Sequence, residues 1–158
     1  MASDAALRVQ LTKLLKGGEA HATLENAVEK FPEALRGVVP KGAEHSAWQE
    51  LEHLRLAQED ILDFSINPGY KAKEWPKEYW PATAAPPDAN AWDASVAGYL
   101  KDREALCALV EDSKTDLYAK IPHGDGQTIL REALLAADHN AYHIGQLVLL
   151  RRLLGAWK

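Results

Sequence analysis

The chain has 158 residues, of which 47% are hydrophobic and 26% are charged, and its formal net charge is −5. This length and composition predict one globular domain spanning residues 1–158 and exclude a disordered or fibrous chain. The acidic balance leaves no broad basic surface, so we expect no nucleic-acid partner. No apolar run reaches the roughly 18 residues of a membrane span, and Met1–Leu7 lacks a signal-peptide core. We therefore expect a cytoplasmic protein with no membrane partner.

Four segments carry an apolar period of three to four residues, and the alternation typical of strands is nearly absent. The pattern predicts an all-α fold, a four-helix bundle. The first helix is expected over about Asp4–Phe31, with Ser3 as its N-cap and Pro32 ending it. The Gly17-Gly18 pair is expected to bend or loosen the middle of this helix.

The second helix is predicted to begin at Ser46, because Ser46-Ala47-Trp48-Gln49 fits a capping box. It continues to the break at Asn67-Pro68-Gly69. The third helix is expected over about Asn90–Tyr118. It contains the lone cysteine, Cys107, which we interpret as a buried apolar residue rather than a catalytic thiol.

The fourth helix follows the Pro122–Gly126 turn and runs to Leu154, where Gly155 stops it. Short to moderate links predict that the first and second helices lie antiparallel, as do the third and fourth. The connection between the second and third helices, residues 67–89, is longer than a bundle needs. Its aromatic residues and prolines predict an ordered loop folded over the bundle, either a substrate lid or a structural brace.

Two histidines four residues apart, His139 and His143, lie on the core-facing side of the fourth helix. Side chains at this spacing stand one above the other, so two imidazoles can converge on one ion. The spacing is similar to that of zinc proteases, but Asn140 occupies the general-base position, and an amide cannot take a proton from water. The pair therefore predicts a metal site other than a peptidase of that type.

A catalytic ion usually has three protein ligands, so a third imidazole is expected from another helix. His53 is our choice, because it lies in mid-helix at the edge of the apolar stripe. His45 and His123 fall at positions that favour exposure. His21 lies on the stripe of the first helix, where a role in the pocket or behind a ligand is as plausible as core packing.

Several other residues are candidates for the site. Glu132, two turns before His139, could orient a ligand histidine or act as a base, or it could form a salt bridge to another helix. Tyr142 and Gln146 can donate hydrogen bonds into a pocket. The loop residues Trp75 and Trp80 could wall that pocket or belong to the core.

The opposite face of the fourth helix is also apolar and needs a second surface to bury. We interpret it as a homodimer contact, with burial beneath the long loop as the alternative. Its members are Leu130, Leu134, Ala137, Ala141, Ile144 and Val148.

Trp48-Gln49-Glu50-Leu51-Glu52-His53 followed by His139-Asn140-Ala141-Tyr142-His143-Ile144-Gly145-Gln146 resembles the DinB-like superfamily of bacterial four-helix-bundle metalloproteins. In that family a tryptophan five residues before a histidine, and a later His-x-x-x-His-x-Gly-Gln, recur. The resemblance spans essentially the whole chain in helix order and length. It implies that His53, His139 and His143 hold a divalent ion.

The resemblance further implies an up-down-down-up bundle, commonly dimeric, with zinc or nickel in an open site. Relatives include thiol S-transferases that use bacillithiol or mycothiol, a maleylpyruvate isomerase and a toxin-resistance hydrolase. Our first hypothesis is a metal-dependent enzyme that acts on a small-molecule substrate, either transferring a low-molecular-weight thiol or hydrolysing the substrate. The alternatives are a non-catalytic metal-binding or ligand-binding protein of stress response, and a helical interaction module without metal.

Overall fold

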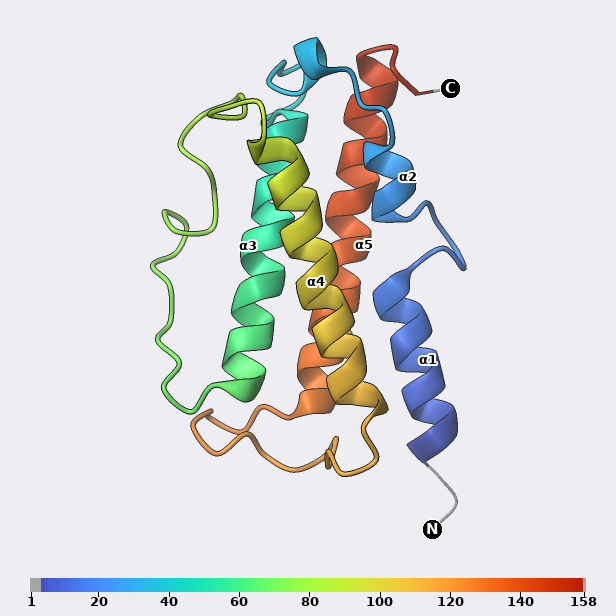
Figure 1. The fold of residues 1–158 in the computed structure, drawn as a ribbon, viewed down its shortest axis with the longest axis vertical. Coiled ribbons are helices and arrows are strands. Elements are labelled where there is room, and N and C mark those ends of the chain that lie inside the picture. The colour runs from blue at the N-terminus through green and yellow to red at the C-terminus, as the bar shows by residue number, and fades with distance from the viewer. Residues whose placement is uncertain (1–3, 158) are drawn as a thin grey trace.

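A computed structural model describes residues 4–157 and contains four long α-helices, one short α-helix and the 3-10 helix η1 (Glu33–Leu35), with no named strand in that range. The first two helices rise along the bundle, α3 and α4 both descend, and α5 rises again (Figure 1). This up-down-down-up arrangement confirms the predicted all-α bundle. The helices are α1 (Asp4–Lys16), α2 (Leu24–Val28), α3 (Ala47–Ile66), α4 (Ala91–Glu111) and α5 (Ile129–Leu153).

The predicted first helix is broken in two rather than bent. Gly17 and Gly18 have φ angles of 72° and 89°, a left-handed conformation that ends α1. A new helix then starts at Thr23, whose side chain and that of Asn26 form a capping box. The prediction of one continuous helix to Phe31 was therefore wrong, because the glycine pair provides a full stop. The predicted cap at Ser3 lies outside the described residues.

The start of α3 at the Ser46 capping box confirms the prediction. The third predicted helix, in contrast, ends at Glu111 rather than near Tyr118. Arg8 of α1 donates hydrogen bonds to the carbonyls of Val110, Asp112 and Thr115 at 2.6, 2.9 and 2.7 Å. These tertiary contacts satisfy carbonyl groups at and just after the end of α4. They take the place of the backbone hydrogen bonds that would form if the helix continued to Tyr118 as predicted.

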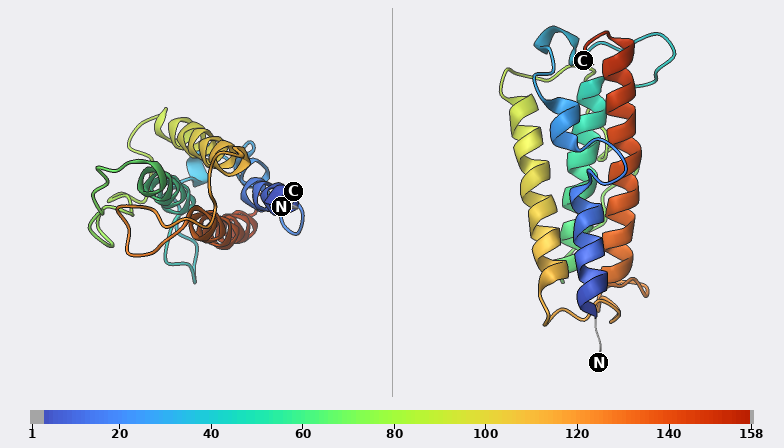
Figure 2. Two further views of the ribbon diagram at one scale, coloured as in Figure 1. Left: turned by 90° about the horizontal axis from the view of Figure 1, so that it is seen from below. Right: turned by 90° about the vertical axis from the view of Figure 1, so that its right-hand side faces the viewer.

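The four long segments stand at the corners of a square, with α1 and α2 diagonally opposite α3 (Figure 2). Two apolar clusters fill the interior, one around Leu62 and Leu106 and the other around Trp92 and Leu147. Cys107 is buried in the first cluster, and burial raises the pKa of its thiol to about 11, which fits a packing residue. No helix within residues 4–157 combines the length and hydropathy that crossing a bilayer requires.

The connection between α3 and α4 runs back along the whole length of α3 (Figure 1). The Tyr70 and Tyr79 hydroxyls donate to the carboxylate of Asp60 at 3.1 and 2.7 Å. Lys73 Nζ lies 3.3 Å from the Leu56 carbonyl oxygen, and Ser46 Oγ donates to a carbonyl further along the loop. The loop is therefore ordered, and its contacts are those of a brace fastened to α3.

Candidate metal centre

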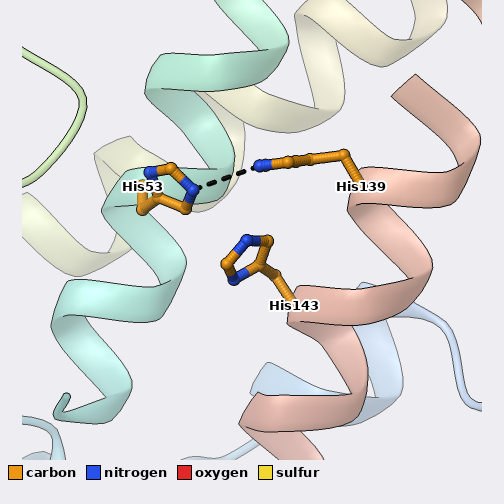
Figure 3. Close-up of side chains that lie close together, drawn as sticks. All are labelled: His53, His139 and His143. Carbon is orange, nitrogen blue, oxygen red and sulfur yellow. Dashed lines mark hydrogen bonds between the residues drawn. The ribbon is translucent and has the colours of Figure 1, made fainter. Parts of the chain in front are cut away.

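The structure brings His53, His139 and His143 together midway along the bundle. His53 projects from α3 and the other two project from consecutive turns of α5, toward one another (Figure 3). One ring nitrogen from each histidine can be chosen so that the three atoms lie within 4.8 Å of one another. The Nε2 atoms of His53 and His139 are 3.1 Å apart.

His53 is held from two sides by the long loop. Its Nδ1 lies 2.8 Å from the carbonyl oxygen of Tyr79 and donates a hydrogen bond to it. The ring of Trp80 stacks on the imidazole, with centroids 3.9 Å apart and planes 2° from parallel. With Nδ1 protonated, the lone pair of His53 is on Nε2, the atom that faces His139.

His143 is oriented by a carboxylate that the sequence prediction missed. Its Nδ1 lies 2.7 Å from Oε2 of Glu50, and both side chains are buried. Glu50 precedes His53 by three residues on α3, so one turn of this helix provides both a candidate ligand and the support of another. A carboxylate behind an imidazole is the usual arrangement at metal sites, because it fixes the tautomer and increases ligand basicity.

His139 is the least supported of the three rings. Its Nδ1 is buried and has no hydrogen-bond partner among residues 4–157. Burial, together with the neighbouring His143 and His53, lowers the pKa of His139 to about 3. Burial also lowers the pKa of His53, although the Tyr79 carbonyl opposes the shift. Both rings are therefore neutral at pH 7, the form that a metal ion requires.

The donor set fits a divalent transition-metal ion. Three nitrogens about 2.05 Å from a tetrahedral ion are separated by about 3.3 Å, which the observed 3.1 Å between two Nε2 atoms approaches. Imidazole nitrogens suit zinc, nickel and copper, whereas calcium and magnesium prefer oxygen. Without a cation, two nitrogen lone pairs at this distance would repel unless one carried a proton. The arrangement can therefore hold one ion and leave further coordination positions open.

A cavity of about 440 Å³ adjoins His143 and Glu50. Its lining combines loop residues before α3, the Trp80 ring and the outer side of α5. The predicted pocket residues Trp80, Tyr142 and Gln146 all belong to it, whereas Trp75 is 67% exposed and is not a lining residue. The full lining consists of Gly42, Ala43, Glu44, His45, Glu50, Trp80, Tyr142, His143, Gln146, Leu149, Leu150 and Leu153.

Two other candidates fall away from the histidine cluster. Glu132 is 2% exposed and pairs with Arg131 on its own helix at 2.8 Å, and burial raises the pKa of its carboxyl group. It lies about 10 Å from His139 along the helix axis. His21 is exposed, bonds to the Ala22 carbonyl, and belongs to the α1–α2 corner, diagonally opposite α3 (Figure 2). The carboxylate in contact with a clustered histidine is thus Glu50.

His45 also differs from its prediction, which was solvent exposure. The side chain is half-buried and stacks on the second face of Trp80, with ring centroids 4.0 Å apart. Trp80 is thus sandwiched between His45 and His53. The position of His45 immediately before the α3 cap could not reveal this contact, because the partner ring comes from 35 residues further along the chain.

The family model described as the DinB superfamily matches residues 18–147. The chain belongs to the DinB superfamily. The matched range includes His53, His139 and His143, as well as Glu50 and the whole bracing loop. No curated protein and no solved structure matches the chain. Membership in the DinB superfamily and the histidine cluster both fit metal binding, and the reaction has to be inferred from the site.

Proposed function

We propose that this DinB-superfamily protein binds one divalent ion, zinc or nickel, through His53, His139 and His143 and is a metal-dependent enzyme acting on a small molecule. The proposal depends on two hydrogen bonds that fix the orientation of the rings. Nδ1 of His53 bonds to the Tyr79 carbonyl and Nδ1 of His143 bonds to Glu50, beside an open cavity. Both rings thereby present Nε2 to a shared centre. Neighbouring space admits a substrate.

A bound ion of this kind polarises a substrate oxygen, lowers the pKa of water, or holds a thiol in its deprotonated form. The surrounding residues favour the third of these roles, the binding of a deprotonated thiol. Hydrolysis is fastest with a base close to the attacking water, because water is far less acidic than a thiol even when a metal ion lowers its pKa. Glu50 is already bonded to His143, and within residues 4–157 no other carboxylate is hydrogen-bonded to the three rings. Transfer of a low-molecular-weight thiol to an electrophile needs no such base, so it is our preferred reaction, with hydrolysis second.

The chain's own residues would then position the reactants. Trp80 covers one face of His53 and excludes water from that side of the cluster. Gln146, one turn beyond His143, lines the cavity and can donate a hydrogen bond to a substrate oxygen, while Tyr142 presents its ring and hydroxyl at the mouth. Together they form a mixed polar and apolar wall, as expected for a site that takes small molecules.

Metal analysis of protein purified without chelators tests the first part of the proposal. We expect about one zinc or nickel ion per chain, lost in His139→Ala and His53→Ala and retained in the control His21→Ala. Absence of metal from the unmodified protein would contradict the site. For the second part, metal-loaded protein is assayed for conjugation of model electrophiles with bacillithiol, mycothiol and glutathione. Metal binding without turnover of any thiol or hydrolysis substrate would instead support the non-catalytic binder.

A homodimer is the second proposal, and its surface differs from the predicted one. Ile144 is buried inside the bundle and Val148 packs against its core, so those two do not face outward. Four large apolar side chains of α5 do face outward: Leu134, Tyr142, Leu149 and Leu153, with exposed fractions of 47%, 63%, 49% and 53%. The last three also line the cavity, so a dimer contact through this stripe would place the partner at the cavity mouth. An apolar surface on one helix can pack against the same surface of a second copy of the chain, related to the first by a two-fold axis. Sedimentation equilibrium is expected to give a dimer that Leu134→Glu dissociates; a monomer would contradict it.

A further inference from the structure

The charged groups that line the cavity beside the histidine cluster are both acidic. Glu44 lies at its rim and is exposed, and Glu50 lies at its inner end and is buried. None of the lining residues is lysine or arginine. The nearest basic residues in the sequence, Lys41, Arg151 and Arg152, are not part of the lining. Arg151 donates hydrogen bonds to backbone carbonyls of the α2 region, and the Arg152 guanidinium lies 5.6 Å from the Trp157 ring centroid.

Besides the rings of His45, Trp80 and His143, the remaining uncharged side chains of the lining form two groups. Leu149, Leu150 and Leu153 form an apolar strip on α5, and Gln146 and Tyr142 supply hydrogen-bonding groups beside it. Burying a carboxylate against such a surface without a cationic partner costs free energy, because it loses its water and gains no ion pair. An amide or hydroxyl group can bond to the glutamine and the tyrosine without that loss.

From this lining we infer that the substrate body in the cavity carries no carboxylate, so that the thiol used here is an uncharged or cationic one. The inference rests on the proposed function, since it assumes that the sulfur reaches an ion held by the three histidines. A negative sulfur is attracted to the ion, while any anionic group elsewhere in the molecule faces Glu44 and Glu50. One carboxylate roughly 6 Å from either of them, at an effective dielectric near 40, weakens binding about tenfold.

Three small thiols that differ in charge test the inference: N-acetylcysteamine is neutral, N-acetylcysteine adds one carboxylate to the same skeleton, and cysteamine carries an amine. Each is titrated calorimetrically into zinc-loaded protein at pH 8, with affinities expressed per thiolate and zinc content checked afterwards. We expect N-acetylcysteamine and cysteamine to bind at least about tenfold more tightly than N-acetylcysteine. The ratio should shrink in 1 M salt, where the screening length is about 3 Å.

A matched pair of variants tests whether the difference in affinity between neutral and anionic thiols arises in the cavity. Glu44→Gln should reduce the preference of neutral over anionic thiol, whereas Glu19→Gln, an exposed glutamate on the α1–α2 connection, should leave it unchanged. Equal binding of N-acetylcysteine and N-acetylcysteamine would overturn the inference and leave the proposed function intact. Failure of all three thiols to bind the zinc-loaded protein would overturn both the inference and the thiol-transfer reaction on which it rests, since no thiol would then reach the ion.

Discussion

Replacing Glu50 by glutamine tests how the protein prepares His143 for a metal ion. The glutamine side chain keeps the shape of the original and an acceptor oxygen, but it removes the negative charge that lies 2.7 Å from Nδ1 of His143. Hydrogen bonds to a charged group contribute about 1.5–3 kcal/mol, and neutral ones about 0.5–1.5 kcal/mol. The substitution should therefore weaken the support of the ring by about 1–2 kcal/mol. Both side chains are buried, so solvent screening reduces this figure little.

This loss corresponds to zinc affinity lower by about five- to thirtyfold, at 1.36 kcal/mol per factor of ten. The figure overlaps the range of about 10- to 100-fold observed when partners of ligand histidines are removed. Competition with a chromogenic chelator at pH 7.5 measures the change directly. Glu52→Gln is the control, because Glu52 lies on the same helix and pairs with Arg55 instead of a histidine. Zinc affinity of Glu50→Gln within twofold of the unmodified protein would refute the reasoning.

Three further predictions concern the stability of the protein and its affinity for zinc. Gly145→Ala should raise the free energy of unfolding by about 1 kcal/mol, because an added Cβ in this helix meets no atom within 4 Å. Gly18→Ala should lower the free energy of unfolding by about 1–2 kcal/mol, because Gly18 has a φ of +89°. Equal effects of the two substitutions would contradict the assignment of the helix break. Metal-free protein should lose stability as the pH falls from about 6.5 toward 3, by up to about 1.4 kcal/mol per pH unit, because His139 takes up a proton in the unfolded state before it does so in the folded state. Urea titrations at several pH values measure this dependence. The same change of stability with pH in unmodified protein and in His139→Gln would contradict the prediction. Tyr79→Phe should lower the free energy of unfolding by about 1 kcal/mol, because the hydrogen bond from the Tyr79 hydroxyl to Asp60 is lost. It should also weaken zinc binding a few-fold, because the Tyr79 carbonyl that accepts from His53 is then held less firmly. Unchanged zinc affinity in the chelator competition would show that the loop between α3 and α4 does not support the site.

Regular patterns made much of the site predictable from sequence. His139 and His143 fall on one face of a helix from their spacing alone, and His53 was selected from its place on the stripe of another helix. Glu132 was a reasonable candidate by the same helical geometry. The structure pairs its carboxylate with Arg131. Helical geometry gives the direction of a side chain around one axis and does not reveal which charged group that side chain will meet. Glu50 could have been found as a carboxylate one turn before His53.

The contacts that were missed depend on segments far apart in the chain. Trp80 reaches both His45 and His53 because the loop runs back along α3, and the Tyr79 carbonyl meets His53 from the same loop. A loop of this length has no periodicity from which its path could be read. Arg8 ended α4 early in the same way, by a contact between residues more than 100 positions apart.

The amino-acid sequence by itself determined the helical class, the capping of α3, the approximate extent of the bundle and the side of α5 that bears two histidines, because each depends on local periodicity and capping groups. The tertiary structure decided the path of the bracing loop, the partner of each imidazole and the acidic lining of the cavity. Those features arise where separate helices and the loop pack together, and the free energy of that packing is not encoded in any single segment.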